Sequence, residues 1–133
     1  MKIKRVIIFT DGAARNNPGP ASIGAIIRDT EGNSINSISR PIGNTTNNQA
    51  EYRAVIAALE YALRSGVSQV DMYSDSELIV NQLNGQYRVK EATLKPLYQR
   101  VKQLQIQLES FKITHVPREQ NEEANRLANM ALG

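Results

Sequence analysis

The N-terminal third of the chain contains three segments with the composition of β-strands, separated only by short polar connections. The β-branched, apolar segment 2–10 predicts a buried strand, and the Gly-, Asn- and Pro-rich segment 11–20 predicts a loop. Segments 22–28 and 34–42 predict two more strands, joined by a hairpin turn over 29–33. Parallel neighbours would need long crossover connections, so these three strands are expected to form an antiparallel meander.

The rest of the chain alternates helical and strand patterns, which indicates crossover connections. A strand that follows a crossover helix lies parallel to its partner. We therefore predict a single α/β domain over residues 1–133, of order βββαβααβα. Its mixed five-stranded sheet has three antiparallel strands, then two parallel ones, with helices on both faces. The later elements predicted are a helix over 48–64 capped by Asn47, a strand over 69–73, a helix capped by Ser74 or Asp75 and ending at 83, a helix over 93–108, a strand over 111–116, a loop over 117–121 and a helix over 121–132.

The side chains available for metal binding are almost all oxygen donors. The chain has no Cys and one His, which excludes a disulfide scaffold, a thiolate zinc or iron–sulfur site and a site built from several histidines. A bound metal is therefore expected to be Mg²⁺, Mn²⁺ or Ca²⁺. Apolar runs reach only about four residues, and the N-terminus lacks the apolar core of a signal peptide. These patterns predict a soluble, cytoplasmic protein with no membrane association.

The net charge of +3 comes from 16 basic and 13 acidic side chains. Residues 1–20 account for all of it, because Lys2, Lys4, Arg5 and Arg15 stand there against a single acid. A mildly basic domain points only weakly to a polyanionic partner, and a solvated surface of mixed charge explains the balance more simply.

Three carboxylates occupy positions where an acid needs an explanation. Asp11 follows the first apolar strand and shares a face with Phe9, and Asp75 ends another apolar strand. Either aspartate alone is explained as a helix cap or turn residue. Glu51 lies four residues before Val55 on the apolar stripe of a predicted helix. A charge there is costly unless it pairs with a base or binds a cation.

The ends of two strands and the start of a packed helix can converge on one rim of a sheet. Three carboxylates at that rim repel one another unless cations neutralise them. Two divalent ions would bring +4 against −3, leaving 16 basic and 10 acidic side chains, a balance of +6 that suits a polyanion. Such a donor set is typical of a two-metal phosphodiester site, where one ion activates water and the other, about 4 Å away, stabilises the leaving oxygen.

Four segments resemble the motifs of the type 1 ribonuclease H family, in the family's order and on the expected strands and helices. A single such motif has little specificity, whereas four in register over about residues 9–132 are highly specific. The segments are Phe-Thr-Asp-Gly-Ala-Ala-Arg-Asn-Asn-Pro-Gly at 9–19, Thr-Asn-Asn-Gln-Ala-Glu at 46–51, Tyr-Ser-Asp-Ser at 73–76 and Asn-Glu-Glu-Ala-Asn-Arg-Leu-Ala at 121–128.

This resemblance implies the ribonuclease H-like fold and an endonuclease that hydrolyses the RNA strand of RNA/DNA hybrids, leaving a 5′-phosphate and a 3′-hydroxyl. It also implies two Mg²⁺ ions, or Mn²⁺ in their place. By position, Asp11, Glu51 and Asp75 match the first three catalytic, metal-binding acids. Asp11 is expected to bridge both ions, and Glu51 and Asp75 each to hold one.

The resemblance assigns contacts with the hybrid as well. By position, Gly12, Asn16, Thr46, Asn47 and Asn48 match substrate-binding residues of the family. Side-chain amides suit this task because they donate to and accept from 2′-hydroxyls in the minor groove. Without the resemblance, loop and cap chemistry explains the amide and hydroxyl side chains about equally well.

The chain departs from the family pattern in its charges. Asn125 stands where the family usually has a fourth acid, an Asp. Its side-chain oxygen can still ligate a metal but without charge, so we expect Asn125 to be a weak fourth ligand and catalytic residue. The basic insertion found in many bacterial members is reduced to 85–91. Affinity for the hybrid is therefore expected to be weaker, or to depend on Lys2, Lys4 and Arg15.

A third departure is the loop before the fourth motif, which lacks the catalytic His of many members. His115 fits the strand pattern and is expected to be structural, so Arg118 is the residue expected to assist near the scissile phosphate or the leaving group. We predict a monomer without an obligate protein partner that removes RNA primers or stray hybrids. Two alternatives stay open: a hybrid-binding domain with weak or no catalysis because of Asn125, and an integrase-like DNA nuclease, which the intact Thr-Asn-Asn segment at 46–48 disfavours.

Overall fold

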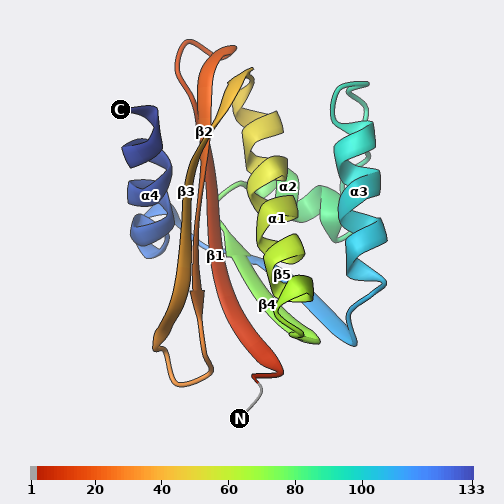
Figure 1. Cartoon of the computed structure of the whole chain (residues 1–133). Coiled ribbons are helices and arrows are strands. Elements are labelled where there is room, and N and C mark those ends of the chain that lie inside the picture. The colour runs from red at the N-terminus through yellow and green to blue at the C-terminus, as the bar shows by residue number, and fades with distance from the viewer. Residues whose placement is uncertain (1–2) are drawn as a thin grey trace.

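A mixed five-stranded sheet separates two layers of helices in the computed structural model, which describes residues 3–133 (Figure 1). Helices α1, α2 and α3 lie on one side of the sheet, and α4 lies on the other. No helix in residues 3–133 is both long and apolar enough to span a membrane. The elements are β1 (Arg5–Ala14), β2 (Gly19–Arg28), β3 (Ser34–Thr45), α1 (Asn47–Arg64), β4 (Gln69–Ser74), α2 (Glu77–Leu83), α3 (Lys95–Gln105), β5 (Ser110–His115), a 3₁₀ turn (Arg118–Gln120) and α4 (Glu122–Leu132).

The strand order is β3-β2-β1-β4-β5, as the connection lengths predict. β1 pairs antiparallel with β2 and parallel with β4, and β5 extends the parallel half beside β4. The meander and the two crossover strands therefore meet at β1, which is the central strand. The predicted fold class and element order are confirmed.

The first three strands are longer than predicted. β1 runs through to Ala14 and β2 begins at Gly19, so the predicted loop over 11–20 shrinks to a turn of four residues. β3 continues through 43–45, three residues beyond the predicted end of that strand. Both corrections have one cause: each segment finds a neighbouring strand to pair with, and ladder hydrogen bonds override the local preference of Gly and Asn for turns. Asp11 thus lies within a strand rather than at its end.

Several helix limits also differ from prediction. Thr46, not Asn47, caps α1, because its hydroxyl accepts from the Gln49 N–H while the Gln49 side chain accepts from the Thr46 N–H. Ser76, not Ser74 or Asp75, caps α2 and accepts from the Ile79 N–H. Among the strands, β4 ends one residue later than predicted and β5 is shifted by one residue to Ser110–His115. Among the helices, α3 spans Lys95–Gln105 rather than 93–108, and α4 begins at Glu122 rather than 121. The predicted loop 117–121 contains the 3₁₀ turn.

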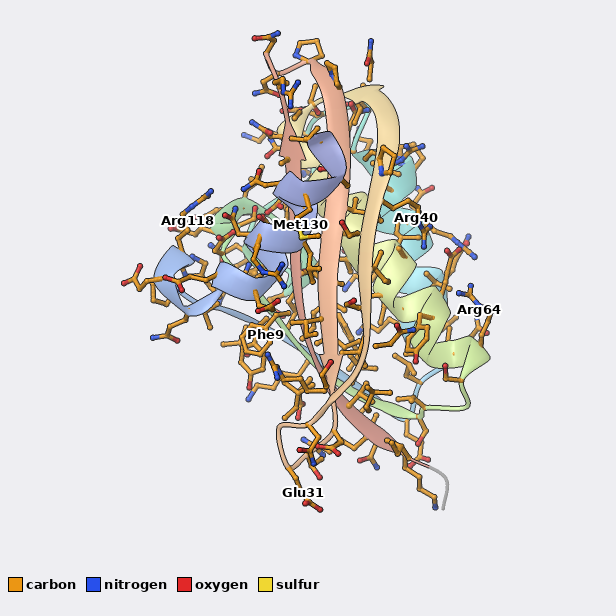
Figure 2. All side chains as sticks on the ribbon, turned by 60° about the vertical axis from the view of Figure 1, so that its left-hand side comes forward. Phe9, Glu31, Arg40, Arg64, Arg118 and Met130 are labelled. Carbon is orange, nitrogen blue, oxygen red and sulfur yellow. The ribbon has the colours of Figure 1, made fainter. Side chains whose placement is uncertain are left out.

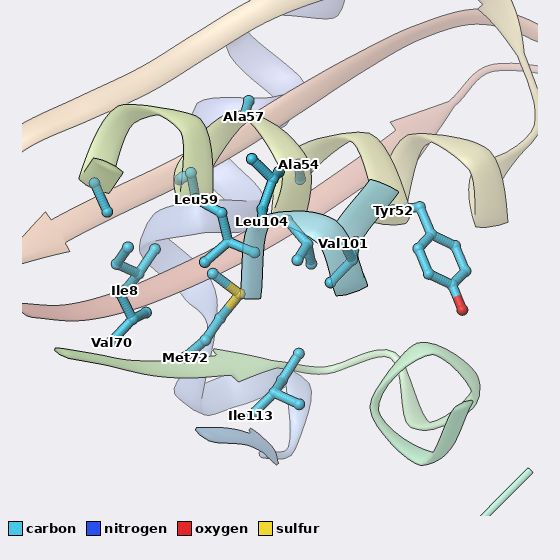
Figure 3. Packing of buried hydrophobic residues seen from close by; sticks show 14 of the residues in the cluster. Ile8, Tyr52, Ala54, Ala57, Leu59, Val70, Met72, Val101, Leu104 and Ile113 are labelled. Atoms are coloured by element: carbon cyan, nitrogen blue, oxygen red, sulfur yellow. The ribbon is translucent and has the colours of Figure 1, made fainter. Parts of the chain in front are cut away.

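The main core lies between the sheet and α1 and α3 (Figure 3). Leu59 of α1 and Leu104 of α3 pack over Ile8 and Met72, which come from the two central parallel strands. All four side chains are buried. This packing holds α1 along β1, and the start of the helix approaches the C-terminal half of the strand at Gly12.

Helix α4 packs closely on the other face of the sheet, mainly against β2. The hydroxyl of Ser22 donates to the Ala128 carbonyl oxygen, and that of Ser39 donates to the Leu127 carbonyl oxygen at 2.6 Å. Gly24 leaves room for the helix, since a Cβ at this position would overlap backbone atoms of Ala124 and Ala128. The first turn of α4 is thereby fixed next to Asp11, the neighbour of Gly24 across the ladder.

We expect Gly24→Ala to lower the free energy of unfolding by about 1–3 kcal/mol, because the added methyl group would push α4 away from β2. Urea unfolding followed by circular dichroism measures the loss. Ser37→Ala, at an exposed site on β3, is the matched control and should change stability by less than about 0.5 kcal/mol. Equal stabilities of the two variants would contradict the close approach of α4.

Candidate active site

Three carboxylates from separate parts of the chain meet beside β1. Asp11 comes from β1, Glu51 from the first turns of α1, and Asp75 from the residue after β4. One oxygen of each lies within 4.8 Å of the others. Asp11 and Glu51 are only 4% and 8% exposed, so both carboxylates are largely removed from water. The convergence expected from the sequence is present in the fold.

The carboxylates meet where β4 ends and β1 continues without a parallel neighbour. β4 ends at Ser74, opposite Thr10, whereas β1 continues for four more residues. Beyond this point side chains of α1 take the place of the missing strand: Glu51 accepts from the Gly12 N–H, and Asn47 accepts from the Ala14 N–H at 2.7 Å. Satisfying the open edge of β1 thus brings the start of α1 to Asp11.

Gly12 makes this approach possible. A Cβ built on Gly12 would overlap backbone atoms of Ala50 and Glu51, so any larger residue would separate β1 from α1. The close approach of α1 to β1 therefore explains why a glycine follows Asp11. Asp11 supplies a carboxylate, and Gly12 lets a second carboxylate come near it.

The cluster raises the pKa values of two of its members. Burial raises the pKa of Glu51 well above its usual range, and the charge of Asp11 raises it further. Burial, then Asp11, raises the pKa of Asp75. Arg118 and Asn121 offset part of this rise in the pKa of Asp75, because a cation and a hydrogen-bond donor both favour the charged form.

The donor set suits a divalent cation. The cluster consists of hard carboxylate oxygens, and the Oδ2 atom of Asp75 is buried without a hydrogen-bond partner among the described residues. A cation would pair with this oxygen and remove the repulsion that raises the two pKa values. Asp11, Glu51 and Asp75 are the residues that would hold it.

Asn125 lies beside Asp11 but presents its nitrogen. Its Nδ2 donates to Asp11 Oδ2 at 2.8 Å, and its Oδ1 accepts from Asn129 Nδ2 at 3.2 Å. Metal ligation through the oxygen therefore requires a half-turn of the amide, which breaks both hydrogen bonds. Ligation by Asn125 stays a prediction, and Asn129, which also lines the site, was not anticipated from the sequence.

The carboxylates lie in a cleft of about 700 Å³. Of the substrate-binding residues predicted, Gly12, Asn47 and Asn48 line it. Thr46 and Asn16 are not among the lining residues: Thr46 is engaged in the α1 cap, and Asn16 lies in the β1–β2 turn with φ of 59°.

Asn17 was not predicted as a site residue, although it lies within the first motif. Its Oδ1 accepts from the Asn47 N–H at 2.8 Å and so ties the β1–β2 turn to the start of α1. The only signal was that Asn17 belongs to a run of turn-forming residues, which does not reveal a partner 30 residues away.

The basic residues are arranged unevenly around the cleft. Arg118, in the 3₁₀ turn before α4, lines it, and Figure 2 shows this side chain well away from Arg40 and Arg64. Arg15 also lines the cleft, but its guanidinium donates to the backbone oxygens of Leu132 and Gly133. Lys4 is exposed, and Lys2 lies outside the described residues.

Comparison with known proteins assigns the family. The sequence model of the family described as "reverse transcriptase-like" matches residues 9–131. The ribonuclease HI of Halobacterium salinarum is 41% identical over 128 residues, which is 96% of this chain and 64% of that protein. The chain belongs to the type 1 ribonuclease H family.

Solved structures of other family members agree with this ribonuclease H fold. The Halobacterium salinarum enzyme superposes with a TM-score of 0.94, at 41% identity over 96% of this chain and 97% of that one. The N-terminal ribonuclease H domain of a Mycobacterium tuberculosis protein gives 0.93, at 38% identity over 97% and 99%. LC11-RNase H1 in complex with an RNA/DNA hybrid gives 0.91, at 44% identity over 96% of each chain.

Some relatives of this ribonuclease H-family chain are longer proteins. The chain spans 64% of the Halobacterium protein and 35% of the mycobacterial protein described as bifunctional. The likeness therefore concerns the ribonuclease H portion of these relatives.

We expect the metal-free protein to lose stability as pH rises from about 4, the ordinary carboxyl range, through neutral pH. The native state, with raised pKa values at Glu51 and Asp75, binds more protons in this range than the unfolded chain does, so deprotonation favours unfolding. Urea unfolding in EDTA at several pH values measures the slope.

Glu51→Gln should flatten that slope and raise stability at the upper end of the range, because one of the repelling charges is gone. Glu109→Gln, which changes an exposed carboxylate, should leave the slope as in the wild type. Parallel profiles for the wild type and Glu51→Gln would contradict the assignment of the pH effect to the cluster.

Proposed function

We propose that this chain is an endonuclease that hydrolyses the RNA strand of RNA/DNA hybrids, leaving a 5′-phosphate and a 3′-hydroxyl. The observation that carries the proposal is the buried cluster of Asp11, Glu51 and Asp75 in a cleft lined by side-chain amides, in a chain of the ribonuclease H family. A relative 44% identical to it has been solved with an RNA/DNA hybrid, which supports the substrate.

Asp11, Glu51 and Asp75 are the residues that would hold two Mg²⁺ ions, or Mn²⁺ in their place. When bound, these ions would supply an activated water and stabilise the charge on the leaving 3′-oxygen. The protein's own task is to hold the three carboxylates within reach of one another despite their repulsion. The Gly12 N–H does this for Glu51, and Asn125 donates to Asp11.

The amides around the cleft suit an RNA strand. Asn47 uses its oxygen on the Ala14 N–H and Asn17 uses its oxygen on the Asn47 N–H, so each keeps its NH₂ group as a donor. Asn48 also lines the cleft, and Asn16 is exposed in the adjoining turn. Donors at these positions fit the 2′-hydroxyls, which distinguish RNA from DNA in the minor groove.

Arg118 is the cation proposed to assist the reaction. It lines the cleft and its charge lowers the pKa of Asp75, which supports a role near the scissile phosphate or the leaving group. His115 is the exposed last residue of β5 and is not among the residues that line the cleft. We also propose that the protein acts as a monomer without an obligate protein partner. The biological role proposed is removal of RNA primers or stray hybrids in the cytoplasm.

The second candidate function is hybrid binding with little or no catalysis. The observation that favours it is Asn125: an uncharged side chain replaces the usual fourth acid, and its nitrogen faces Asp11. A single cleavage assay separates the two candidates.

The wild type should cut the RNA strand of a labelled 12–20-mer hybrid when Mg²⁺ or Mn²⁺ is present, and should leave the corresponding DNA duplex intact. Asp11→Asn should abolish cutting while keeping the circular dichroism spectrum and the folded state. Product ends are identified by gel mobility before and after phosphatase treatment. No product at any metal concentration would refute the enzyme, and cutting of the DNA duplex would favour the DNA nuclease.

Asn125→Asp should raise the cutting rate and lower the metal concentration for half-maximal rate by roughly 10-fold or more, because a full charge about 4 Å from an ion contributes a few kcal/mol. Rates across a Mg²⁺ titration measure this. Asn129→Asp adds the same charge one helical turn away and should have a smaller effect. An unchanged titration for Asn125→Asp would show that residue 125 is not a ligand.

A further inference from the structure

Asn121 is a buried amide that none of the roles above uses. It lies between the 3₁₀ turn and α4 and is 1% exposed. As the residue before the first turn of α4, it stands where an Asn side chain normally caps a helix, yet it makes no capping hydrogen bond. Its Nδ2 instead donates to the Thr10 carbonyl oxygen at 2.9 Å, across 111 residues of sequence.

The bond to Thr10 falls at the point where the sheet divides. Thr10 is the last residue of β1 that pairs with β4, and Asp11 follows it. Because alternate residues of a strand direct their N–H and C=O groups to the same edge, the Thr10 carbonyl lies on the same edge of β1 as the Gly12 and Ala14 N–H groups. Asn121, Glu51 and Asn47 thus occupy three successive positions along the open edge of β1.

The backbone of Asn121 connects the remaining groups of the site. Its N–H donates to the Arg118 carbonyl oxygen at 2.9 Å, and its carbonyl oxygen accepts from the Asn125 N–H at 3.1 Å. Its side-chain amide also lowers the pKa of the Asp75 carboxyl group. The Oδ1 atom of Asn121 is buried without a hydrogen-bond partner among the described residues, which carries a free-energy cost.

We propose that Asn121 is a positioning residue that sets the distance between Asp11 on β1 and the groups contributed by Asp75, Arg118 and Asn125. This inference rests on the proposed function, since the groups it positions are those that would bind the metals and act on the hybrid. An amide suits this place, because it donates to the Thr10 carbonyl and adds no charge beside Asp75.

Asn121→Asp separates positioning from capping. Asp caps helices as well as Asn does and has the same shape, but an ionised carboxylate cannot donate to the Thr10 carbonyl. We expect Mn²⁺ affinity, measured by calorimetry without substrate, to fall roughly 10- to 100-fold, and kcat to fall by a similar factor with KM for the hybrid unchanged. The added negative charge by itself would strengthen Mn²⁺ binding, so the two effects have opposite signs.

Asn121→Ala tests the same bond without a new charge and should weaken Mn²⁺ binding and kcat in the same direction. Ser22→Ala is the matched control: it removes another buried hydrogen bond between the sheet and α4, one that reaches Ala128 in the helix rather than Thr10 beside Asp11. It should lower the melting temperature and leave Mn²⁺ affinity and kcat as in the wild type.

Wild-type Mn²⁺ affinity and kcat in Asn121→Ala would overturn the proposal, as would losses in Ser22→Ala equal to those in the Asn121 variants. If the wild type does not cut the hybrid, the proposed function fails, while the Mn²⁺ titrations still decide whether Asn121 positions the carboxylates.

Discussion

The site depends on one structural constraint: β1 continues past the end of its parallel neighbour β4. The peptide groups exposed along that edge need hydrogen-bond partners, and side chains from α1 and from the start of α4 supply them. The same gap admits Asp75, which leaves β4 just as the strands separate. The carboxylate cluster therefore lies where the hydrogen-bond ladder between β1 and β4 ends.

Close packing of α1 and α4 on the sheet holds the carboxylates of this cluster together despite their repulsion. Gly12 lets α1 approach β1 from one side, and Gly24 lets α4 approach β2 from the other. Neither helix could lie so close if these positions carried a side chain. The close packing keeps Glu51 and Asn125 near Asp11.

Amides rather than charges make most of the contacts around the carboxylates. Asn125 and Asn121 donate towards Asp11 and the strand that carries it, and Asn47 closes the edge of β1. An amide can offer a donor and an acceptor at once without adding charge to a crowded site. Asn125 is one of several neutral groups at the site. Compared with the family's usual acid, it attracts a metal less strongly, but it adds no repulsion to the carboxylates of the metal-free protein.

The sequence by itself determined the order of elements, the meander and the identity of Asp11, Glu51 and Asp75, because strand periodicity, connection length and acids on apolar segments are local signals. It misplaced the ends of β1 and β3, because Gly- and Asn-rich segments become strand only when a neighbour is there to pair with. Asn17, Asn121 and Asn129 could not be assigned, since their partners lie on other elements or their role depends on which side of α4 faces the cleft. Only the tertiary structure decided where the sheet divides and which side chains complete its edge, because hydrogen bonds between distant residues form after the elements have packed.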